Sequence, residues 1–222
     1  MPRRRAPPVS PARHPFPPSD LDSRPLPIAE NRGPWWRSYY PTTRGGQPWG
    51  PLRLARTRSN RFDSPTYRYG VLYAAENLDG ALIETFGRNL TIRLLQLADL
   101  EARHLALVHA SRSLRFVDLT GRGLAGLGAD SRLWAGDDYE ISQAWSRAFY
   151  KHPLLPDGLL YGCRHDPSER AVAIFGRVRR AMKAEALGSV VSGSMVVSLA
   201  VLRSLRRYGF KLDRPTITIT RP

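Results

Sequence analysis

Three residues of complementary chemistry lie close together in the first half of the chain. Arg61 belongs to an Arg-Phe-Asp triplet, Tyr73 stands near the end of an apolar run, and Glu84 follows in the next segment. A guanidinium fork binds a pyrophosphate through bidentate contacts, and a tyrosine ring offers a flat face to a heterocycle. A carboxylate stabilises an oxocarbenium-like centre and orients the group that attacks it. Together, the three side chains could cleave a glycosidic bond in a phosphate-bearing ligand.

Each of these residues also has a structural interpretation. Glu84 precedes Arg88 by four residues on a predicted helix, in the order that favours a surface ion pair worth about 0.3–0.5 kcal/mol. Tyr73 ends an apolar strand, where an aromatic ring commonly packs in the core with its hydroxyl at the edge. Arg61, taken alone, is a surface residue. From the residues alone, these alternatives stay open.

Other candidates for catalysis or metal binding carry weaker signals. Cys163 and His165 are two residues apart in a predicted strand, so they could share a face as a thiolate–imidazole pair. A lone cysteine, however, is more often a small buried hydrophobic residue. His104 and His109 have no partner acids at ligand spacing, and the sequence contains no zinc-binding, phosphate-loop, Rossmann or nucleophile-elbow motif. We therefore expect no metal site and no bound cofactor.

The charge balance favours a ligand or partner that carries negative charge. The 222 residues contain 34 Lys and Arg against 19 Asp and Glu, for a net charge of +15, and 42% of them are hydrophobic. A basic surface attracts phosphates, nucleic acid or an acidic protein. The aromatic cluster from Trp35 to Tyr40, which includes Arg37, could stack the bases of single-stranded nucleic acid, or it could close the edge of a core. A basic nucleic-acid-binding module is therefore an alternative to an enzyme.

The elements that must position these residues alternate between short strands and helices. Short apolar runs predict strands, and a repeat of apolar residues every three to four positions predicts helices. The predicted strands cover Tyr69–Ala75, His104–Ala110, Ser113–Leu119, Gly158–Cys163 and Arg170–Phe175, and Thr216–Thr220 is a last strand or a frayed end. The predicted helices run from an Asn77 or Asp79 cap to Phe86, from Asp137-Asp138 to Lys151, and from Leu199 to Tyr208. Their irregular order predicts a mixed α+β fold with a largely antiparallel sheet and flanking helices.

The N-terminal region and one apolar segment bear on domain organisation and location. Twelve of the 19 prolines fall in the first 50 residues, which predicts a disordered arm over residues 1–33 and a folded domain over residues 34–222. The first residues lack the apolar stretch of a signal peptide, and the single cysteine suits a reducing compartment, so we expect a cytoplasmic protein. The uncharged Ala186–Leu202 segment is too short and too polar to favour a membrane span.

Several motifs, taken together, resemble those of the RES domain family. They are Arg61-Phe62-Asp63-Ser64, Tyr69–Glu76, Ala81–Thr85, Gly158–Arg164 with Ala171–Phe175, and the closing Leu205–Phe210. The resemblance spans roughly Pro34 to Asp213. It implies a core similar to that of ADP-ribosyltransferases and an enzyme that degrades NAD, as its substrate, by hydrolysis or phosphorolysis. It also implies a bacterial toxin restrained by a helix-turn-helix antitoxin of the Xre type.

The resemblance further implies roles for individual residues. Glu84 would stabilise the ribose cation and orient the attacking water or phosphate. Arg61 would bind the pyrophosphate of NAD, and Tyr73 would face the nicotinamide ring. Arg37 would be a second phosphate ligand, because family members often have an arginine in a similar early segment. Transfer of ADP-ribose to a macromolecule uses the same groups and stays open as an alternative reaction. The oligomeric state also stays open, and a homodimer is one option.

Two positions depart from the family pattern. The serine of the family falls at Cys163, and a thiol is a weaker hydrogen-bond donor than a hydroxyl. Ser142, in the second predicted helix, is an alternative source of that hydroxyl. Asn60 stands where a glycine often precedes the motif arginine. A further alternative is therefore a catalytically impaired relative that acts through a protein partner. The Cys163→Ser variant tests this alternative, since a large gain in rate would show that the native thiol had impaired catalysis.

Overall fold

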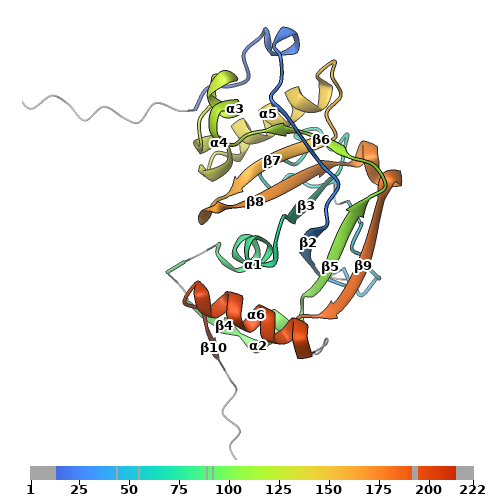
Figure 1. The fold of residues 1–222 in the computed structure, drawn as a ribbon, viewed down its shortest axis with the longest axis vertical. Helices are drawn as coiled ribbons and strands as arrows, with labels where there is room; N and C mark the ends of the chain where they lie inside the picture. Colours follow the sequence, from blue (N-terminus) through green and yellow to red (C-terminus); the bar gives the residue numbers. More distant parts are fainter. Residues whose placement is uncertain are drawn as a thin grey trace, which may run out of the picture.

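A twisted sheet of eight strands organises the computed structural model, which describes residues 14–43, 45–54, 56–88, 90–91, 93–191 and 195–213 (Figure 1). The strands follow the order β1-β6-β7-β8-β3-β2-β5-β9. The β6–β7 pair is parallel, and the other neighbouring pairs of this sheet are antiparallel. The strands are β1 (Ile28–Asn31), β2 (Trp35–Tyr39), β3 (Val71–Ala75), β5 (His104–Ala110), β6 (Leu114–Asp118), β7 (Gly158–Cys163), β8 (Asp166–Phe175) and β9 (Met182–Ser189). The prediction of a mixed fold with a largely antiparallel sheet is confirmed.

Helices and a small ribbon flank the sheet. The helices are α1 (Leu78–Phe86), α2 (Leu97–Glu101), α3 (Gly121–Gly126), α4 (Arg132–Ala135), α5 (Tyr139–Lys151) and α6 (Met195–Arg207), with the 3-10 turns η1 (Leu21–Ser23) and η2 (Gly176–Ala181). The ribbon pairs β4 (Leu94–Gln96) with β10 (Lys211–Asp213) in parallel. In Figure 1, α1 lies in the middle of the molecule, between β3 and α6, whereas α3, α4 and α5 gather near β6 and β7.

The alternation of side chains along each strand separates two apolar cores. On β3, Val71 and Ala75 belong to one core, and Leu72 and Ala74 belong to the other. Apolar residues of α1 and α5 close the first core, and Tyr73 packs against this same core. The face of the sheet that carries Tyr73 is therefore the face covered by these two helices.

Helix α1 forms as its sequence predicts, and a close contact holds it on the sheet. The Asn77 side chain caps the helix by accepting a hydrogen bond from the Gly80 backbone N–H at 2.8 Å. A Cβ atom at Gly80 would lie 3.0 Å from Cβ of Ala75 and 3.5 Å from Sγ of Cys163. The missing side chain therefore lets α1 approach β3 and β7 closely, which sets the position of Glu84 one turn later.

Helix α5 is amphipathic and begins at its expected acidic residue. The Asp138 carboxylate accepts a hydrogen bond from the Ile141 N–H at 3.3 Å, which satisfies one of the free donors at the start of a helix. Ile141, Trp145 and Phe149 point into the core and are at most 1% exposed. Burial of this apolar face fixes the rotation of α5, so that its other buried side chains meet the loop that carries Arg61.

The early aromatic cluster is largely part of the core. Trp35 and Tyr39, on β2, are 0% and 6% exposed, whereas Tyr40, just after the strand, is 51% exposed. Trp35 packs edge-on against Phe116, with their ring centroids 5.7 Å apart. These contacts favour the interpretation that the cluster closes the edge of a core over the interpretation that it stacks nucleic-acid bases.

Part of the expected N-terminal arm belongs to the fold. Strand β1 pairs with β6 from Ile28 opposite Val117 to Asn31 opposite Leu114. The reason is that a strand at the edge of a sheet needs backbone pairing on one side alone, so a short segment without an apolar pattern of its own can add there. The structure thus differs from the prediction of disorder over residues 14–33, and residues 1–13 lie outside the described residues.

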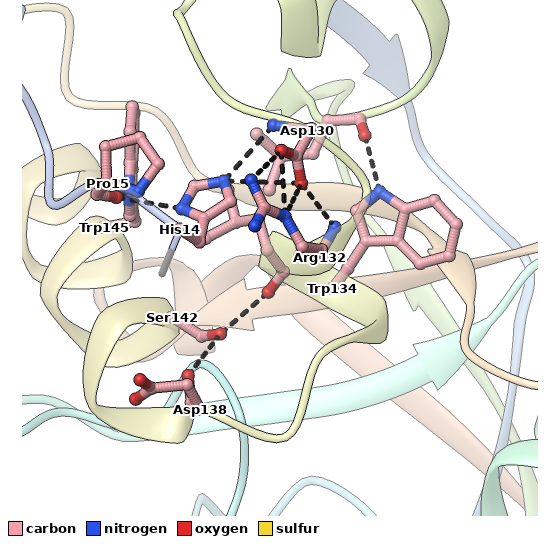
Figure 2. A network of polar contacts seen from close by, with 10 residues as sticks. His14, Pro15, Asp130, Arg132, Trp134, Asp138, Ser142 and Trp145 are labelled. Atoms are coloured by element: carbon pink, nitrogen blue, oxygen red, sulfur yellow. Dashed lines mark hydrogen bonds and ion pairs between the residues drawn. The ribbon is translucent and has the colours of Figure 1, made fainter. Parts of the chain in front are cut away.

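Polar contacts also dock the chain before β1 onto α5 and the turn before α4. Figure 2 shows His14 between Trp145 and Asp130. The Asp130 backbone N–H donates a hydrogen bond to Nε2 of His14 at 3.2 Å, and the Trp145 indole donates one to the Pro15 carbonyl at 2.9 Å. His14 is 7% exposed, so this docked segment covers one side of the helix that supports the Arg61 loop.

The uncharged Ala186–Leu202 segment divides between two elements. Its first residues end β9 at Ser189, and its last residues belong to α6, which starts at Met195. None of the helices in the described ranges has the length and apolar character needed to cross a membrane. The predicted strand or frayed end at Thr216–Thr220 lies outside the described residues.

Candidate active site

A cavity of about 310 Å³ opens on the sheet face that carries Tyr73. Its wall is built by β2, β3, α1, the turn after β7 and the start of α5. The arginines that line it are Arg37, Arg61, Arg88, Arg103 and Arg164. Its aromatic lining residues are Trp36, Tyr73, Tyr139 and Tyr161. Glu84 is the one acidic residue among the described lining residues, so the cavity suits an anionic ligand with an aromatic ring.

Glu84 presents a carboxylate that is only half engaged. Its Oε1 accepts a hydrogen bond from the Arg164 backbone N–H at 2.7 Å, and no described residue forms a hydrogen bond with its Oε2. The expected surface pair with Arg88 does not occur among the ion pairs of the described residues. Burial raises the pKa of Glu84, while the Arg164 N–H and the positive charge of Arg61 act in the opposite direction.

Arg61 is held in the cavity wall by two contacts of its guanidinium. The residue is 9% exposed, its guanidinium donates a hydrogen bond to the Gly136 carbonyl, and its Cζ lies 4.8 Å from the centre of the Tyr139 ring. Burial lowers the pKa of Arg61, and the nearby Glu84 carboxylate is among the charges that raise it. The guanidinium and the carboxylate are therefore electrostatic neighbours in this cavity.

Two buried polar residues of α5 hold the loop that carries Arg61. Gln143 donates hydrogen bonds through Nε2 to the carbonyls of Arg58 and Asn60 at 2.9 and 3.0 Å. Ser146 donates one to the Phe62 carbonyl at 2.7 Å. Because this loop has no regular structure of its own, these bonds satisfy its backbone and fix its path. The position of Arg61 thus depends on a helix that is far away in the sequence.

Asp63 connects the same loop to Tyr73. The Tyr73 hydroxyl donates a hydrogen bond to Asp63 Oδ1 and accepts one from the Phe62 N–H, both at 3.0 Å. The other carboxylate oxygen of Asp63 accepts hydrogen bonds from Thr57 and Asn60. Burial, reinforced by the charge of Asp63, raises the pKa of Tyr73 well above its ordinary value. Tyr73 is therefore a neutral phenol whose hydroxyl is occupied, which leaves its ring to contact a ligand.

Comparison with known protein families matches residues 34–194 to the RES domain. This match covers most of the chain. The chain belongs to the RES domain family. No curated protein sequence matches it significantly. Membership in this family is consistent with a toxin-like domain that has an NAD-related activity. The matched range contains every cavity residue described above.

The structure does not support the expected role of Arg37 in this RES domain. Arg37 reaches the cavity wall, but it alternates with Trp36 along β2 and so points its side chain toward the opposite face, which carries Trp35. Its Nη2 donates to the Arg53 carbonyl at 3.3 Å in the loop that covers that face. Burial lowers the pKa of Arg37 to about 10, and Tyr39 rather than Glu84 supplies the nearby charge. We therefore do not assign Arg37 to the site.

Cys163, at the position expected for the family serine, lies behind the cavity rather than in its wall. The residue is 0% exposed, and its Sγ faces the Gly80 carbonyl of α1 at 3.9 Å. Burial raises the pKa of its thiol, and the Glu84 charge raises it further. A thiolate partnership with His165, which does line the cavity, thus has no support. In the described part of the chain, no group of three or more His, Cys, Asp or Glu residues could hold a metal ion.

Ser142 also lies away from the cavity. Its hydroxyl donates to the carbonyls of Leu133 at 2.7 Å and Asp138 at 3.3 Å, so it ties α4 to the start of α5 (Figure 2). The residue is 1% exposed. Its hydroxyl is therefore committed to the backbone, and we do not propose it as a ligand of the substrate.

The position of Cys163 leads to a testable expectation. The Cys163→Ser variant should leave the turnover rate within about threefold of the native rate, which corresponds to about 0.7 kcal/mol, because this side chain does not reach the cavity. The new hydroxyl can donate to the Gly80 carbonyl that the thiol already faces. Rates of the two proteins under saturating substrate, beside their melting temperatures, check this expectation. A gain of tenfold or more would instead support the view that the native thiol impairs catalysis.

Several cavity residues carry no distinctive sequence signal. Tyr139 stands in the first turn of a predicted helix, and Arg164 follows the predicted strand that ends at Cys163. Arg88 and Arg103 look like ordinary surface arginines in a chain rich in arginine. A pattern of hydrophobic residues predicts where a helix or strand lies, but it does not predict which polar residues of distant elements meet.

Proposed function

We propose that this RES domain cleaves the bond between nicotinamide and ribose in NAD. The observation that carries the proposal is the meeting, in one cavity, of the Glu84 carboxylate with the Arg61 guanidinium and the ring of Tyr73. The guanidinium binds the pyrophosphate, and the ring faces the nicotinamide. NAD is the substrate, and the proposal requires no further cofactor.

The reaction follows from the charges at the bond that breaks. The bond joins C1 of the ribose to the positively charged ring nitrogen of nicotinamide. Its electron pair moves to that nitrogen, so nicotinamide leaves as a neutral molecule and the ribose becomes an oxocarbenium-like cation. The Glu84 carboxylate stabilises this cation with the oxygen that no described residue occupies. Attack on C1 then completes the reaction, and water loses a proton when it is the attacking group.

The experiment that tests this function is the release of nicotinamide from NAD by the purified protein, followed chromatographically with and without inorganic phosphate. Formation of ADP-ribose would identify a glycohydrolase. Formation of its 1-phosphate, only when phosphate is present, would identify a phosphorylase. Label transferred from the adenine-labelled substrate to protein would identify ADP-ribosyl transfer. Absence of nicotinamide release from the folded protein would contradict the proposal.

The pH dependence of the rate provides a second measurement on the same residue. Glu84 must be ionised to stabilise a cation, and its pKa is raised by burial, so activity is lost as the pH falls through this raised pKa. We expect kcat/KM to fall about tenfold per pH unit on the acid side, with a midpoint above the ordinary carboxyl value of about 4.3. Circular dichroism at each pH separates this loss from unfolding. A flat profile down to pH 4 would contradict the role of Glu84.

The proposed toxin role includes a protein partner. The excess of arginine in the cavity suits an acidic segment of a helix-turn-helix antitoxin, which would cover the opening and exclude NAD. Such a partner should inhibit nicotinamide release in competition with NAD. Inhibition that NAD cannot overcome would contradict this mode of binding.

A further inference from the structure

We propose that Arg88 and Arg103 form a separate phosphate subsite in the cavity, which binds the phosphate farther from the bond that breaks and so selects dinucleotides over nicotinamide mononucleotide. This inference rests on the proposed function, which it deepens. It assigns a phosphate-binding role to two arginines that do not take part in the cleavage reaction itself.

The two arginines line the cavity from the end of α1 and from the turn before β5, whereas Arg61 lines it from the loop before β3. Arg88 follows the end of α1, one turn beyond Glu84, and Arg103 lies between α2 and β5. Burial is the main influence on the pKa of both Glu84 and Arg103, but the charges that act on the two groups differ. The pKa of Glu84 is lowered by the positive charges of Arg61, Arg164 and Arg88. The pKa of Arg103 is raised by Tyr40 and Asp99 and lowered by Arg88. Arg88 is common to both sets, so its guanidinium lies near enough to Glu84 and to Arg103 to act on the pKa of each.

Neither arginine of this subsite is neutralised by an acid at close range. The ion pairs formed within the described ranges do not include Arg88 or Arg103, whereas Arg164 pairs with Asp137 at 2.6 Å. The charge of Arg88 lowers the pKa of Arg103 beyond the larger effect of burial, so the two guanidinium groups repel each other. A phosphate between them would relieve this repulsion and accept several charge-assisted hydrogen bonds.

An aromatic contact orients the Arg103 side chain. Its Cζ lies 3.7 Å from the centre of the Tyr40 ring, a distance typical of a cation–π contact. The ring covers one face of the planar guanidinium, and the Tyr40 hydroxyl engages part of its hydrogen-bonding edge, so the remaining N–H donors can bind a phosphate. Arg103 is therefore held in place before a ligand arrives, which lowers the entropic cost of binding.

The number of phosphates in the ligand decides what the subsite recognises. A nicotinamide mononucleotide carries one phosphate, which Arg61 can bind beside Glu84. A dinucleotide carries a second phosphate, and this group reaches the subsite. Inorganic phosphate, as an attacking group, has the same chemistry and is the other source of a phosphate here. The experiment below separates the two sources.

The test compares two substrates in matched variants. We expect Arg103→Ala to lower kcat/KM for NAD at least tenfold and to leave kcat/KM for nicotinamide mononucleotide within twofold. Arg88→Ala should act in the same direction at a pH above the acid limb of the rate, where Glu84 stays ionised without the charge of Arg88. Arg180→Ala is the control, because Arg180 is exposed, does not line the cavity and carries the same charge. An equal loss for both substrates, or no loss for NAD, would overturn the proposal, as would a rise in KM for inorganic phosphate alone.

A binding experiment tests the subsite independently of turnover. Calorimetry with ADP-ribose should show a Kd at least tenfold higher for Arg103→Ala than for the native protein, while the Kd for ribose 5-phosphate stays unchanged. If the native protein releases no nicotinamide but meets this expectation, the proposed reaction fails and the subsite stands. If ADP-ribose binds equally to both proteins, or does not bind the native protein, the subsite is refuted. Should Arg103→Ala fail to fold, Arg88→Ala decides the same comparison.

Discussion

The Glu84→Gln variant should lose nicotinamide release by a factor of about 10²–10⁴ in kcat. The amide preserves the size of the side chain and can still accept the hydrogen bond from the Arg164 N–H, which the native Oε1 accepts at 2.7 Å. It removes the negative charge that faces the ribose cation. Because that charge acts mainly on the transition state, kcat should fall far more than the affinity for NAD.

The measurement for this variant is the initial rate at saturating NAD, together with its affinity for ADP-ribose. Glu185→Gln is the matched control, since it removes the same charge from an exposed position on β9 that does not line the cavity. It should keep the native rate. A Glu84→Gln protein that is folded and retains the native kcat would refute the assignment of this carboxylate to the reaction.

The Arg61→Ala variant should lower kcat/KM for NAD by about 10²-fold, which corresponds to about 2.7 kcal/mol. The guanidinium supplies a planar pair of donors for a phosphate, and its charge lies close enough to Glu84 to affect the ionisation of both groups. Its removal also withdraws the cation that favours the ionised carboxylate. The acid limb of the pH profile should therefore move to higher pH in the variant.

Arg61→Lys separates charge from shape in this second experiment. Lysine keeps the positive charge but cannot form the bidentate contact, so its kcat/KM should fall between the native and alanine values. Arg180→Ala serves again as the control for loss of one positive charge. If Arg61→Ala changed neither kcat/KM nor the pH profile, Arg61 would be a structural residue that holds Gly136 and Tyr139.

Local sequence patterns predicted the elements around the site because a helix cap or an apolar repeat acts within one short segment of the chain. The Asn77 cap and the apolar residues after it define α1, and the period of the apolar residues after Asp138 defines α5. Strands β5 and β7 match their predicted ranges, since both are continuous apolar runs. The β1 strand was missed because its pairing with β6 depends on a partner far along the chain.

The amino-acid sequence by itself determined the mixed α+β class, the helix that carries Glu84, and the grouping of motifs that resembles the RES domain. Only the tertiary structure decided which polar residues meet. The alternation along β2 is a local property, but the face that opens to the cavity depends on where α1, α5 and the distant loops pack. For this reason Arg37 falls on the opposite face, Cys163 lies beneath α1, and Arg103 joins Arg88 in the lining of the cavity that contains Glu84.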